Sequence, residues 1–380
     1  MPRRFHKKSR NGCDQCKERR VKDQCDETRP LCTTCTSRGL SCTYTKPASR
    51  KRPAEGPSPT STSAEPKSPA SPMPNLQTRT YDVRHLQLMH KFSTETYKSL
   101  CGDESDMEDW QILIPKLAYN HEFLLNGIFA LSALHTVATT SDTEEALSFL
   151  DTALHCNELA FAPFREALSH LTPQNCDAVF AHSAIIALIG IALPRLNARY
   201  RGECFSMIET MMTVFELLQG ASKISRISRP WRQATIFFKY DFWRMENTPL
   251  DADMAGAIEK LRELNRCIVN TDSAQFHINQ EAIDSLQDSL AKFTHAPHPA
   301  PILAWLTYVK REFVDGLRVR QPFQLLILMH WAVLLKEMEA HFWWAQGCGQ
   351  ALVAELSNEL KDQNENWTSA LRWPQHKVGV

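Results

Sequence analysis

Glycine is scarce in this 380-residue chain, with 13 residues. The sequence has no glycine-rich loop that could cradle a phosphate and no Gly-x-Ser-x-Gly elbow that could present a nucleophile. The first ten residues carry five Lys and Arg side chains with no apolar run behind them, which argues against a secretory signal peptide. The most apolar stretches, 178–193 and 322–345, are too short or carry charge, so we expect core helices rather than membrane spans.

Net charge is also absent, because 43 Lys and Arg side chains balance 43 Asp and Glu side chains. The balance is a cancellation between two parts of the chain. Residues 1–52 hold 15 basic and 5 acidic side chains, and the remainder is acidic by the same margin. A basic head on an acidic body indicates that the head has a polyanionic partner.

Large apolar side chains are too few in residues 1–44 to build an ordinary core, so something other than hydrophobic burial must fold this head. Residues 45–74 contain eight prolines, nine Ser or Thr residues and no aromatic residue, which is typical of an extended linker. We therefore expect a small head at 1–44, a linker at 45–80, a larger body at 81–373 and a short tail at 374–380.

The body shows helical patterning from about Tyr81 onward, because its apolar residues recur at steps of three and four. Proline or glycine separates most of these patterns, and no alternating run of useful length predicts a strand. We predict an all-α bundle of about eight to eleven helices. The patterns cover 86–92, 124–134, 143–171, 176–193, 199–218, 230–245, 254–268, 281–293, 302–317 and 323–344.

Half of the twelve cysteines lie in the head, where two CxxC pairs are each followed by a lone cysteine. Zinc takes four ligands in a tetrahedron, so two separate sites would need eight thiolates. Six are enough if two of them bind both ions, because a thiolate can bridge two metals. The pattern therefore predicts two Zn²⁺ ions, whose binding would supply the folding free energy of the head. The six residues are Cys13, Cys16, Cys25, Cys32, Cys35 and Cys42.

The stretch from Gly12 to Tyr44, GCDQCKERRVKDQCDETRPLCTTCTSRGLSCTY, resembles the fungal Zn(2)-C6 binuclear cluster of transcription factors. The resemblance implies two short helices related by pseudo-symmetry, joined by a loop with Pro30, the first helix entering the DNA major groove. It also implies a division of the metal ligands: Cys13 and Cys32 bridge the two ions, Cys16 and Cys25 complete the first site, and Cys35 and Cys42 complete the second.

The spacing departs from that family at one place. Eight residues separate Cys16 from Cys25, where the family usually has six, as if Asp23 and Gln24 had been inserted. A strictly positional assignment would make Asp23 the ligand, and zinc does accept carboxylate. A thiolate two residues further on is the softer ligand and suits a bridged cluster better, so we assign the site to Cys25.

Four basic residues, Lys17, Arg19, Arg20 and Lys22, lie between Cys16 and Cys25. We expect most of them to contact DNA phosphates. One or two must read bases, and guanine offers paired acceptors to Lys or Arg in the major groove. By resemblance to the family, Arg20 is the predicted base reader, in a site built on CGG-like half-sites.

A second basic segment begins the linker, with Lys46, Arg50, Lys51 and Arg52. It is a candidate nuclear-localisation signal, although a plain solvated charge run explains it as well. Together with the predicted DNA binding, it leads us to expect action in the nucleus.

Two partial metal-binding motifs in the body each lack a required ligand. His121-Glu122 begins a zinc-protease pattern, but Leu125 stands where the second histidine is needed, and the calcium-loop-like start at Asp251 has Arg262 at its twelfth position. No acid, base and nucleophile come together in sequence, so we predict that the chain is not an enzyme. The remaining cysteines are expected to be small buried hydrophobes: Cys101, Cys156, Cys176, Cys204, Cys267 and Cys348.

The aromatic run Phe342, Trp343 and Trp344 fits either a bundle core or the lining of a ligand pocket. The segments Asn120–His135 and Leu326–Gly349 resemble the regulatory domain of fungal sterol-uptake-control proteins. That resemblance implies a homodimer, an activating role and a small apolar effector bound in the helical body.

These observations predict a nuclear, zinc-dependent RNA polymerase II transcription regulator that binds specific double-stranded DNA. We expect an activator of a fungal biosynthetic gene cluster, in secondary metabolism. A sterol-responsive regulator of sterol uptake or synthesis genes is the alternative. A zinc-binding adaptor for RNA is a more distant one, since the head offers only Phe5 and Tyr44 for stacking on bases.

Overall fold

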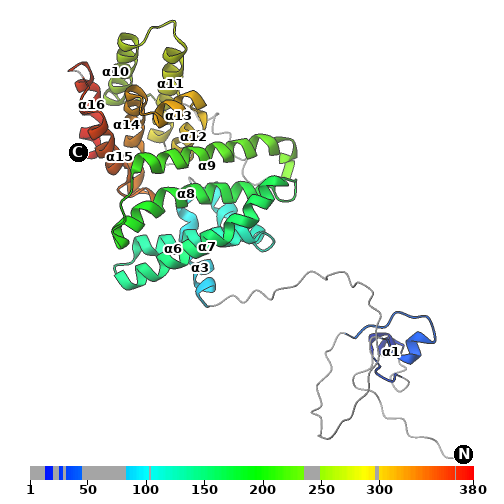
Figure 1. Cartoon of the computed structure of the whole chain (residues 1–380). Coiled ribbons are helices and arrows are strands. Elements are labelled where there is room, and N and C mark those ends of the chain that lie inside the picture. The colour runs from blue at the N-terminus through cyan, green and yellow to red at the C-terminus, as the bar shows by residue number, and fades with distance from the viewer. Residues whose placement is uncertain are drawn as a thin grey trace, which may run out of the picture. The chain divides into compact units, whose positions relative to one another are not determined.

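The computed structural model describes eight stretches of the chain: 13–19, 25–28, 31–44, 83–101, 104–234, 249–295, 299–363 and 365–380. The chain divides into two compact units, Met1–Gln77 and Thr78–Val380, and each is considered by itself (Figure 1). The first unit contains two short helices, α1 (Asp14–Glu18) and α2 (Thr33–Thr36).

All the regular secondary structure in the described residues of the second unit is helical, and these residues contain no strand. The predicted all-α class is therefore confirmed. Its α-helices are α3 (Val83–Thr94), α4 (Glu104–Glu108), α5 (Ile114–Ala118), α6 (Glu122–Thr139), α7 (Thr143–Ser169), α8 (Cys176–Arg201), α9 (Met207–Ser228), α10 (Ala252–Ile268), α11 (Ala274–His295), α12 (Pro299–Tyr308), α13 (Arg311–Arg318), α14 (Pro322–Glu337), α15 (Cys348–Glu359) and α16 (Glu365–Val378). The short 3₁₀-helices are η2 (Thr96–Ser99), η4 (Arg229–Ala234), η7 (Met338–Ala340) and η8 (Trp343–Ala345). The element η3 (Asp109–Leu113) is a short π-helix.

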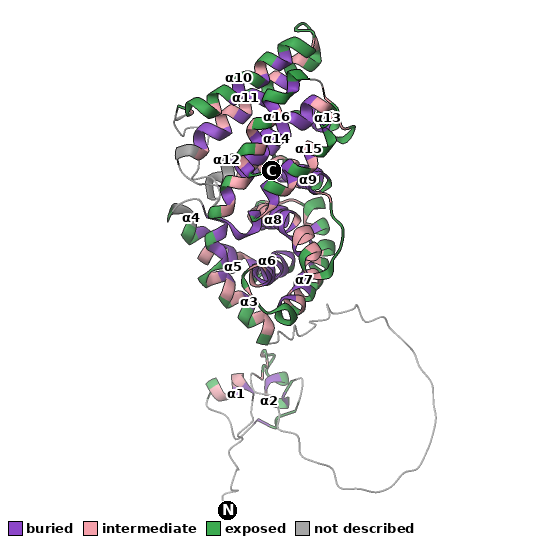
Figure 2. Ribbon diagram, turned by 90° about the vertical axis from the view of Figure 1, so that its left-hand side faces the viewer, coloured by how far each residue is buried: buried purple, intermediate pink, exposed green. Residues whose placement is uncertain are grey.

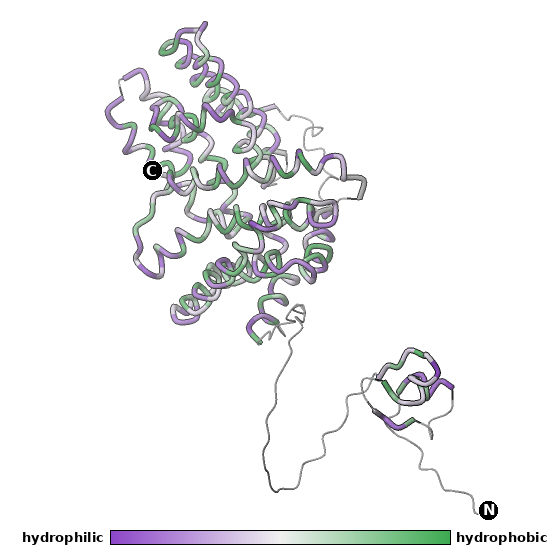
Figure 3. Tube along the Cα trace, turned by 45° about the vertical axis from the view of Figure 1, so that its right-hand side comes forward, coloured by the Kyte–Doolittle hydropathy of each residue, from purple (hydrophilic) through white to green (hydrophobic). Residues whose placement is uncertain are grey.

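The core of this unit is built around its most apolar helices. Helix α6 packs against α3, α7 and α8, α8 packs against α9, and α14 packs against α11, α15 and α16. Figure 2 shows α8 and α14 largely in the colour of buried residues, and Figure 3 shows hydrophilic and hydrophobic residues alternating along the outer helices. Helices α6 and α8 are long and apolar enough to cross a membrane by length and composition, but 72% of the most apolar 18-residue stretch of each is buried inside the unit, as in a core helix.

Tryptophan side chains tie the core helices together, so this aromatic cluster belongs to the bundle core. Trp305, Trp331 and Trp344 are fully buried. Each satisfies its indole N–H with a backbone carbonyl, at 3.0 Å to Ala282, 3.1 Å to Ile302 and 2.9 Å to Ser99, respectively. The paired N–H groups remove the cost of burying a polar atom with each large ring.

Several helix boundaries differ from the sequence-based expectation. The sequence pattern at 176–193 ends just before Pro194, but α8 continues through this proline to Arg201. The helix is terminated by Gly202, which adopts a left-handed φ of 69°. Burial of Leu196 beyond the proline outweighs the lost backbone hydrogen bond. The pattern at 302–317 forms two helices, since Lys310 is extended between them. Helix α16 continues to Val378, into the segment expected to be a tail, because Val378 is buried.

The cysteines of the helical unit mostly behave as small hydrophobes. Cys101, Cys156, Cys176 and Cys348 are buried, whereas Cys204 and Cys267 are exposed, contrary to the expectation for those two. Cys204 lies in the connection between α8 and α9, and Cys267 lies in the last turn of α10, so neither faces a neighbouring helix.

The N-terminus of α9 is capped from another helix. The Glu355 carboxylate, on α15, accepts hydrogen bonds from the backbone N–H groups of Met207 at 2.6 Å and Ile208 at 3.2 Å, and from the Ser206 hydroxyl. These N–H groups have no partner within α9, and the positive end of the helix dipole favours a carboxylate there. One side chain therefore joins two helices that are far apart in sequence.

Substitution Glu355→Ala should lower the free energy of unfolding of the helical unit by about 1–2 kcal/mol, since it leaves helix-terminal donors without an acceptor. Urea unfolding followed by circular dichroism measures this. The control Glu359→Ala removes an exposed carboxylate from the same helix and should change stability by less than about 0.5 kcal/mol. Equal effects of the two substitutions would contradict the capping role.

One histidine is buried without a polar partner. His182, on α8, is fully buried, and neither ring nitrogen has a hydrogen-bond partner among the described residues. Its ring packs against Phe123 and Phe164, at centroid distances of 5.4 Å and 4.5 Å, and faces Gly127 of α6, where a Cβ would approach Nδ1 to 2.5 Å. Burial lowers the pKa of His182 to about 3.

Because the ordinary histidine pKa is 6.5, the unfolded chain binds a proton that the folded chain excludes, so stability is lost as pH falls from 6.5 toward 3. We expect His182→Met to stabilise the protein by about 1 kcal/mol near pH 7 and by about 3 kcal/mol near pH 5. Thermal and urea unfolding at both pH values test this. The exposed His155→Met is the control, and a His182→Met gain that does not grow with acidity would refute the assignment.

Candidate metal centre

Each CxxC pair in the first unit lies at the start of a helix. Cys13 and Cys32 have extended backbones, with ψ of 157° and 148°, and occupy the N-cap positions of α1 and α2. Their sulfur atoms accept hydrogen bonds from the backbone N–H groups of Cys16 and Cys35, each at 3.4 Å. A CxxC step therefore brings its second sulfur back beside the first within one helical turn.

The two halves of the unit repeat the same arrangement. The backbone N–H of Cys13 donates to the Cys25 sulfur at 3.4 Å, and the N–H of Cys32 donates to the Cys42 sulfur at 3.3 Å. The lone cysteine of each half thus returns to the N-cap of its own helix. This is the pseudo-symmetry that the sequence resemblance implied, and it is visible here in matching hydrogen bonds.

The longer spacing in the first half does not displace its lone cysteine. Eight residues separate Cys16 from Cys25, whereas six separate Cys35 from Cys42. The hydrogen bonds to the Cys25 and Cys42 sulfurs nevertheless differ by only 0.1 Å. Asp23 lies outside the described residues, and Cys25 occupies the place that the pseudo-symmetry requires.

The sulfur atoms lie at distances that suit zinc. Sγ of Cys13 is 3.7 Å from those of Cys32 and Cys35, and Sγ of Cys16 is 3.8 Å and 3.9 Å from the same two atoms. A tetrahedral site with Zn–S bonds of about 2.3 Å has S–S edges of about 3.8 Å. These four sulfurs all lie within 4.8 Å of one another, and the residues are buried. The S–S spacing therefore fits zinc–thiolate coordination, with Cys16 and Cys35 assigned to different ions of the binuclear cluster.

The lone cysteines lie beside the two N-cap cysteines. The Cys25 sulfur accepts from the backbone N–H of Cys13, and the Cys42 sulfur accepts from that of Cys32. The Sγ atoms of Cys13 and Cys32 lie 3.7 Å apart. Cys13 and Cys32 thus lie between the two lone cysteines, which agrees with the bridging role that the family resemblance implies for them, and the full division of the ligands stays a prediction.

The electrostatic environment of the sulfurs differs between these positions. Burial raises the pKa of the Cys13 and Cys16 thiols and raises that of Cys32 to about 12. Burial is the largest single influence on Cys25 and Cys42 as well, but hydrogen bonds from backbone N–H groups and from neighbouring thiols together outweigh it and lower their pKa. A metal ion that binds these thiols must displace their protons, so its affinity depends on pH.

Two polar side chains, those of Asp26 and Tyr44, hold the loop beside the centre, a role that the sequence patterns did not predict for either. Asp26 accepts a hydrogen bond from the Thr33 backbone N–H at 3.0 Å and from the hydroxyls of Thr28 and Thr33, and these bonds lower its pKa to about 2. The Tyr44 hydroxyl donates to the Thr28 carbonyl at 2.9 Å. Asp26 thus ties the loop after Cys25 to the first turn of α2.

The predicted DNA-contacting residues lie only partly within the described chain. Lys17 is in the last turn of α1 and pairs with Asp14 at 3.8 Å, and Arg19 is the exposed C-cap residue. The predicted base reader and the other candidate contacts lie outside the described residues, as do all four candidate nuclear-localisation residues: Arg20, Lys22, Lys46, Arg50, Lys51 and Arg52.

Comparison with protein families agrees with this geometry. Residues 11–51 match the fungal Zn(2)-Cys(6) binuclear cluster domain. The segment is a Zn(2)-Cys(6) binuclear cluster domain. Domains of this family bind two zinc ions, which is the cofactor that the cysteine count predicted.

Two fungal transcription factors are similar to this chain over different lengths. A Zn(2)-C6 fungal-type transcription factor of Gibberella zeae is 26% identical over 439 aligned residues, which cover 98% of this chain and 86% of that protein. The Zn(2)-C6 fungal-type transcription factor afumD of Aspergillus fumigatus is 35% identical over 191 residues. This second match spans 49% of the chain and about half, 48%, of that relative.

The sterol regulators match over a much shorter length. Sterol uptake control protein 2 of Saccharomyces cerevisiae is 60% identical over 43 residues, which is 11% of this chain and 4% of that protein. The match lies in the Zn(2)-Cys(6) cluster region. The resemblance of the helical unit to the sterol regulators therefore stays a prediction.

The assignment of Cys25 to the first zinc site predicts a specific change in metal content. Cys25→Ser should lower the zinc content below two ions per chain, because a hydroxyl is a poor zinc ligand compared with a thiolate. Asp23→Ala should leave it unchanged. Native mass spectrometry of the full-length protein measures the stoichiometry, and the opposite pattern would assign the ligand to Asp23.

Proposed function

We propose that this protein is a sequence-specific, DNA-binding regulator of transcription by RNA polymerase II, acting in the nucleus. The single observation that carries the proposal is the six-cysteine domain, in which α1 begins within a CxxC pair and ends beside the cations Lys17 and Arg19. The metal fixes the start of α1, and the cations at its end are the groups that a phosphate backbone attracts.

The relatives support the same class of activity. The Gibberella zeae and Aspergillus fumigatus proteins are named as transcription factors of the Zn(2)-C6 type, and the first aligns over nearly the whole of this chain. A catalytic role has no comparable support, since the cysteines that come together are the ligands of a structural metal centre. We therefore propose a non-enzymatic regulator in which the helical unit governs dimerisation and response.

We propose further that the protein activates a fungal biosynthetic gene cluster and binds CGG-like half-sites as a homodimer. The sterol-responsive alternative is less well supported, because the match to Sterol uptake control protein 2 covers 11% of the chain. A small apolar effector in the helical unit belongs to that alternative. The RNA-adaptor alternative is weakened by the match to a cluster domain of transcription factors.

Selection of random double-stranded DNA by the full-length, zinc-loaded protein tests the central proposal. We expect enrichment of sequences with CGG-like triplets, and loss of this enrichment when zinc is removed by a chelator, because the apo domain has no core to hold α1 in place. Equal retention of all sequences by the zinc-loaded protein would overturn the proposal, and preferential retention of single-stranded RNA would favour the adaptor.

Arg20→Ala should relax the preference for the selected sequence by about 1–3 kcal/mol, because a bidentate contact to guanine is lost. Competition binding with matched and mismatched DNA at fixed salt measures this discrimination. Arg38→Ala removes the same charge from an exposed position just after α2 and serves as the control, with discrimination retained. If Arg20→Ala weakens binding to every sequence equally, Arg20 is a phosphate contact instead.

A further inference from the structure

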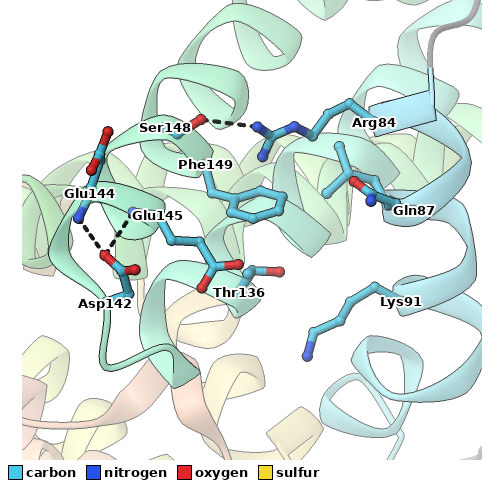
Figure 4. A pocket seen from close by; sticks show the side chains of 10 residues that line it. Arg84, Gln87, Lys91, Thr136, Asp142, Glu144, Glu145, Ser148 and Phe149 are labelled. Atoms are coloured by element: carbon cyan, nitrogen blue, oxygen red, sulfur yellow. Dashed lines mark hydrogen bonds between the residues drawn. The ribbon is translucent and has the colours of Figure 1, made fainter.

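An open cleft of about 590 Å³ lies between the first helix of the helical unit and the hairpin of α6 and α7 (Figure 4). Helix α3 forms one wall with Arg84, Gln87 and Lys91. The start of α7 forms the other wall, and Leu88 and Phe149 supply the apolar part of the lining. The cleft is thus bounded by cations on one side and by carboxylates on the other.

Arg84 is held in place without being neutralised. Its Nη2 donates to the Ser148 hydroxyl at 3.0 Å, and its guanidinium carbon lies 4.1 Å from the centre of the Phe149 ring (Figure 4). No carboxylate pairs with it among the described residues. A planar guanidinium fixed by one hydrogen bond and one ring retains further N–H donors, which suits bidentate recognition of a ligand carboxylate.

In the acidic wall, one carboxylate caps a helix and another faces the cleft. Asp142 caps α7, accepting from the backbone N–H groups of Glu144 at 2.8 Å and Glu145 at 3.2 Å. The Glu145 side chain extends toward the cleft in Figure 4 and accepts a hydrogen bond from the Thr140 hydroxyl at 2.5 Å. Its carboxylate can still accept from a ligand ammonium group.

The two walls do not neutralise each other, since no ion pair joins α3 to α7 in the part of the chain described. Lys91 pairs instead with Glu95, the residue that follows α3, at 2.5 Å. An anion alone would be repelled by the acidic wall, and a cation alone by Arg84. A ligand that carries both charges is attracted by both walls.

The geometry points to a binding site for a small zwitterion, a free α-amino acid with an apolar side chain. Its carboxylate binds Arg84, its ammonium group binds Glu145, and its side chain packs on the half-buried Phe149. Glu145 and Ser148, which holds Arg84, are three residues apart on α7, so the two charged groups lie about one helical turn apart. This close spacing matches adjacent ligand charges and disfavours a long ligand.

The position of the site suggests what binding would do. A ligand held by α3 and α7 at once joins the helix that follows the linker to the body of the unit. It therefore favours the arrangement in which the two helices are docked. This inference goes beyond the proposed DNA-binding function and does not depend on it, because ligand binding is measured without DNA.

Isothermal calorimetry on the full-length, zinc-loaded protein tests the site with a matched set of probes. L-phenylalanine and L-leucine carry both charges, phenylacetate lacks the ammonium group, and phenethylamine lacks the carboxylate. We expect the two amino acids to bind, and the single-charge analogues of phenylalanine to bind at least about tenfold more weakly, since each forfeits one charged contact. No binding by either amino acid, or equal binding by phenylacetate, would overturn the proposal.

Variants locate the binding on the molecule. Arg84→Gln and Glu145→Gln should each weaken phenylalanine binding about tenfold or more, because each removes one of the two charged partners. Arg311→Gln and Glu312→Gln, exposed on α13, make the same changes outside the cleft and should have no effect. Circular dichroism melts confirm that the variants remain folded. Binding that is unaffected in Arg84→Gln and Glu145→Gln would place the ligand elsewhere and refute the site.

Discussion

The first unit depends on the crowding of thiol groups around its centre. Four cysteine sulfurs lie 3.7–3.9 Å apart at the contacts that join the two CxxC pairs. Neutral thiols gain little from such contacts, and thiolates would repel one another, so the arrangement is favourable chiefly with a divalent cation among them. Both short helices start at this centre, and the orientation of Lys17 on α1 follows from it.

The helical unit has a different source of stability. Its core is apolar, its buried indoles are paired with carbonyls, and a carboxylate from α15 completes the start of α9. Loss of zinc should therefore leave the helical unit folded while it abolishes the order of the first unit. The protein can in this way lose its proposed DNA-reading surface while the helical unit stays folded.

The sequence allowed the metal centre and the fold class to be predicted, for clear physical reasons. Cysteine spacing is a local signal that directly reflects tetrahedral coordination, and a three- or four-residue apolar period directly reflects a helix. The continuation of α8 through Pro194 could not be predicted, because it depends on packing against other helices. The capping of α9 by Glu355 of α15 and the cleft at Arg84 could not be predicted either. Each brings together residues that lie far apart in the sequence and that belong to no recognisable motif.

The matching hydrogen bonds of the two cysteine halves have a further consequence. The scaffold around the metal nearly repeats itself, and its charged residues repeat in part: Arg19 after α1 corresponds to Arg38 after α2, whereas Lys17 corresponds to the uncharged Thr36. A near-duplicate frame whose first half carries one additional cation has a built-in direction. Under the proposed function, two bound copies would therefore differ in orientation, and the order of the DNA sequences that they contact would record whether they face each other, face apart or follow in tandem.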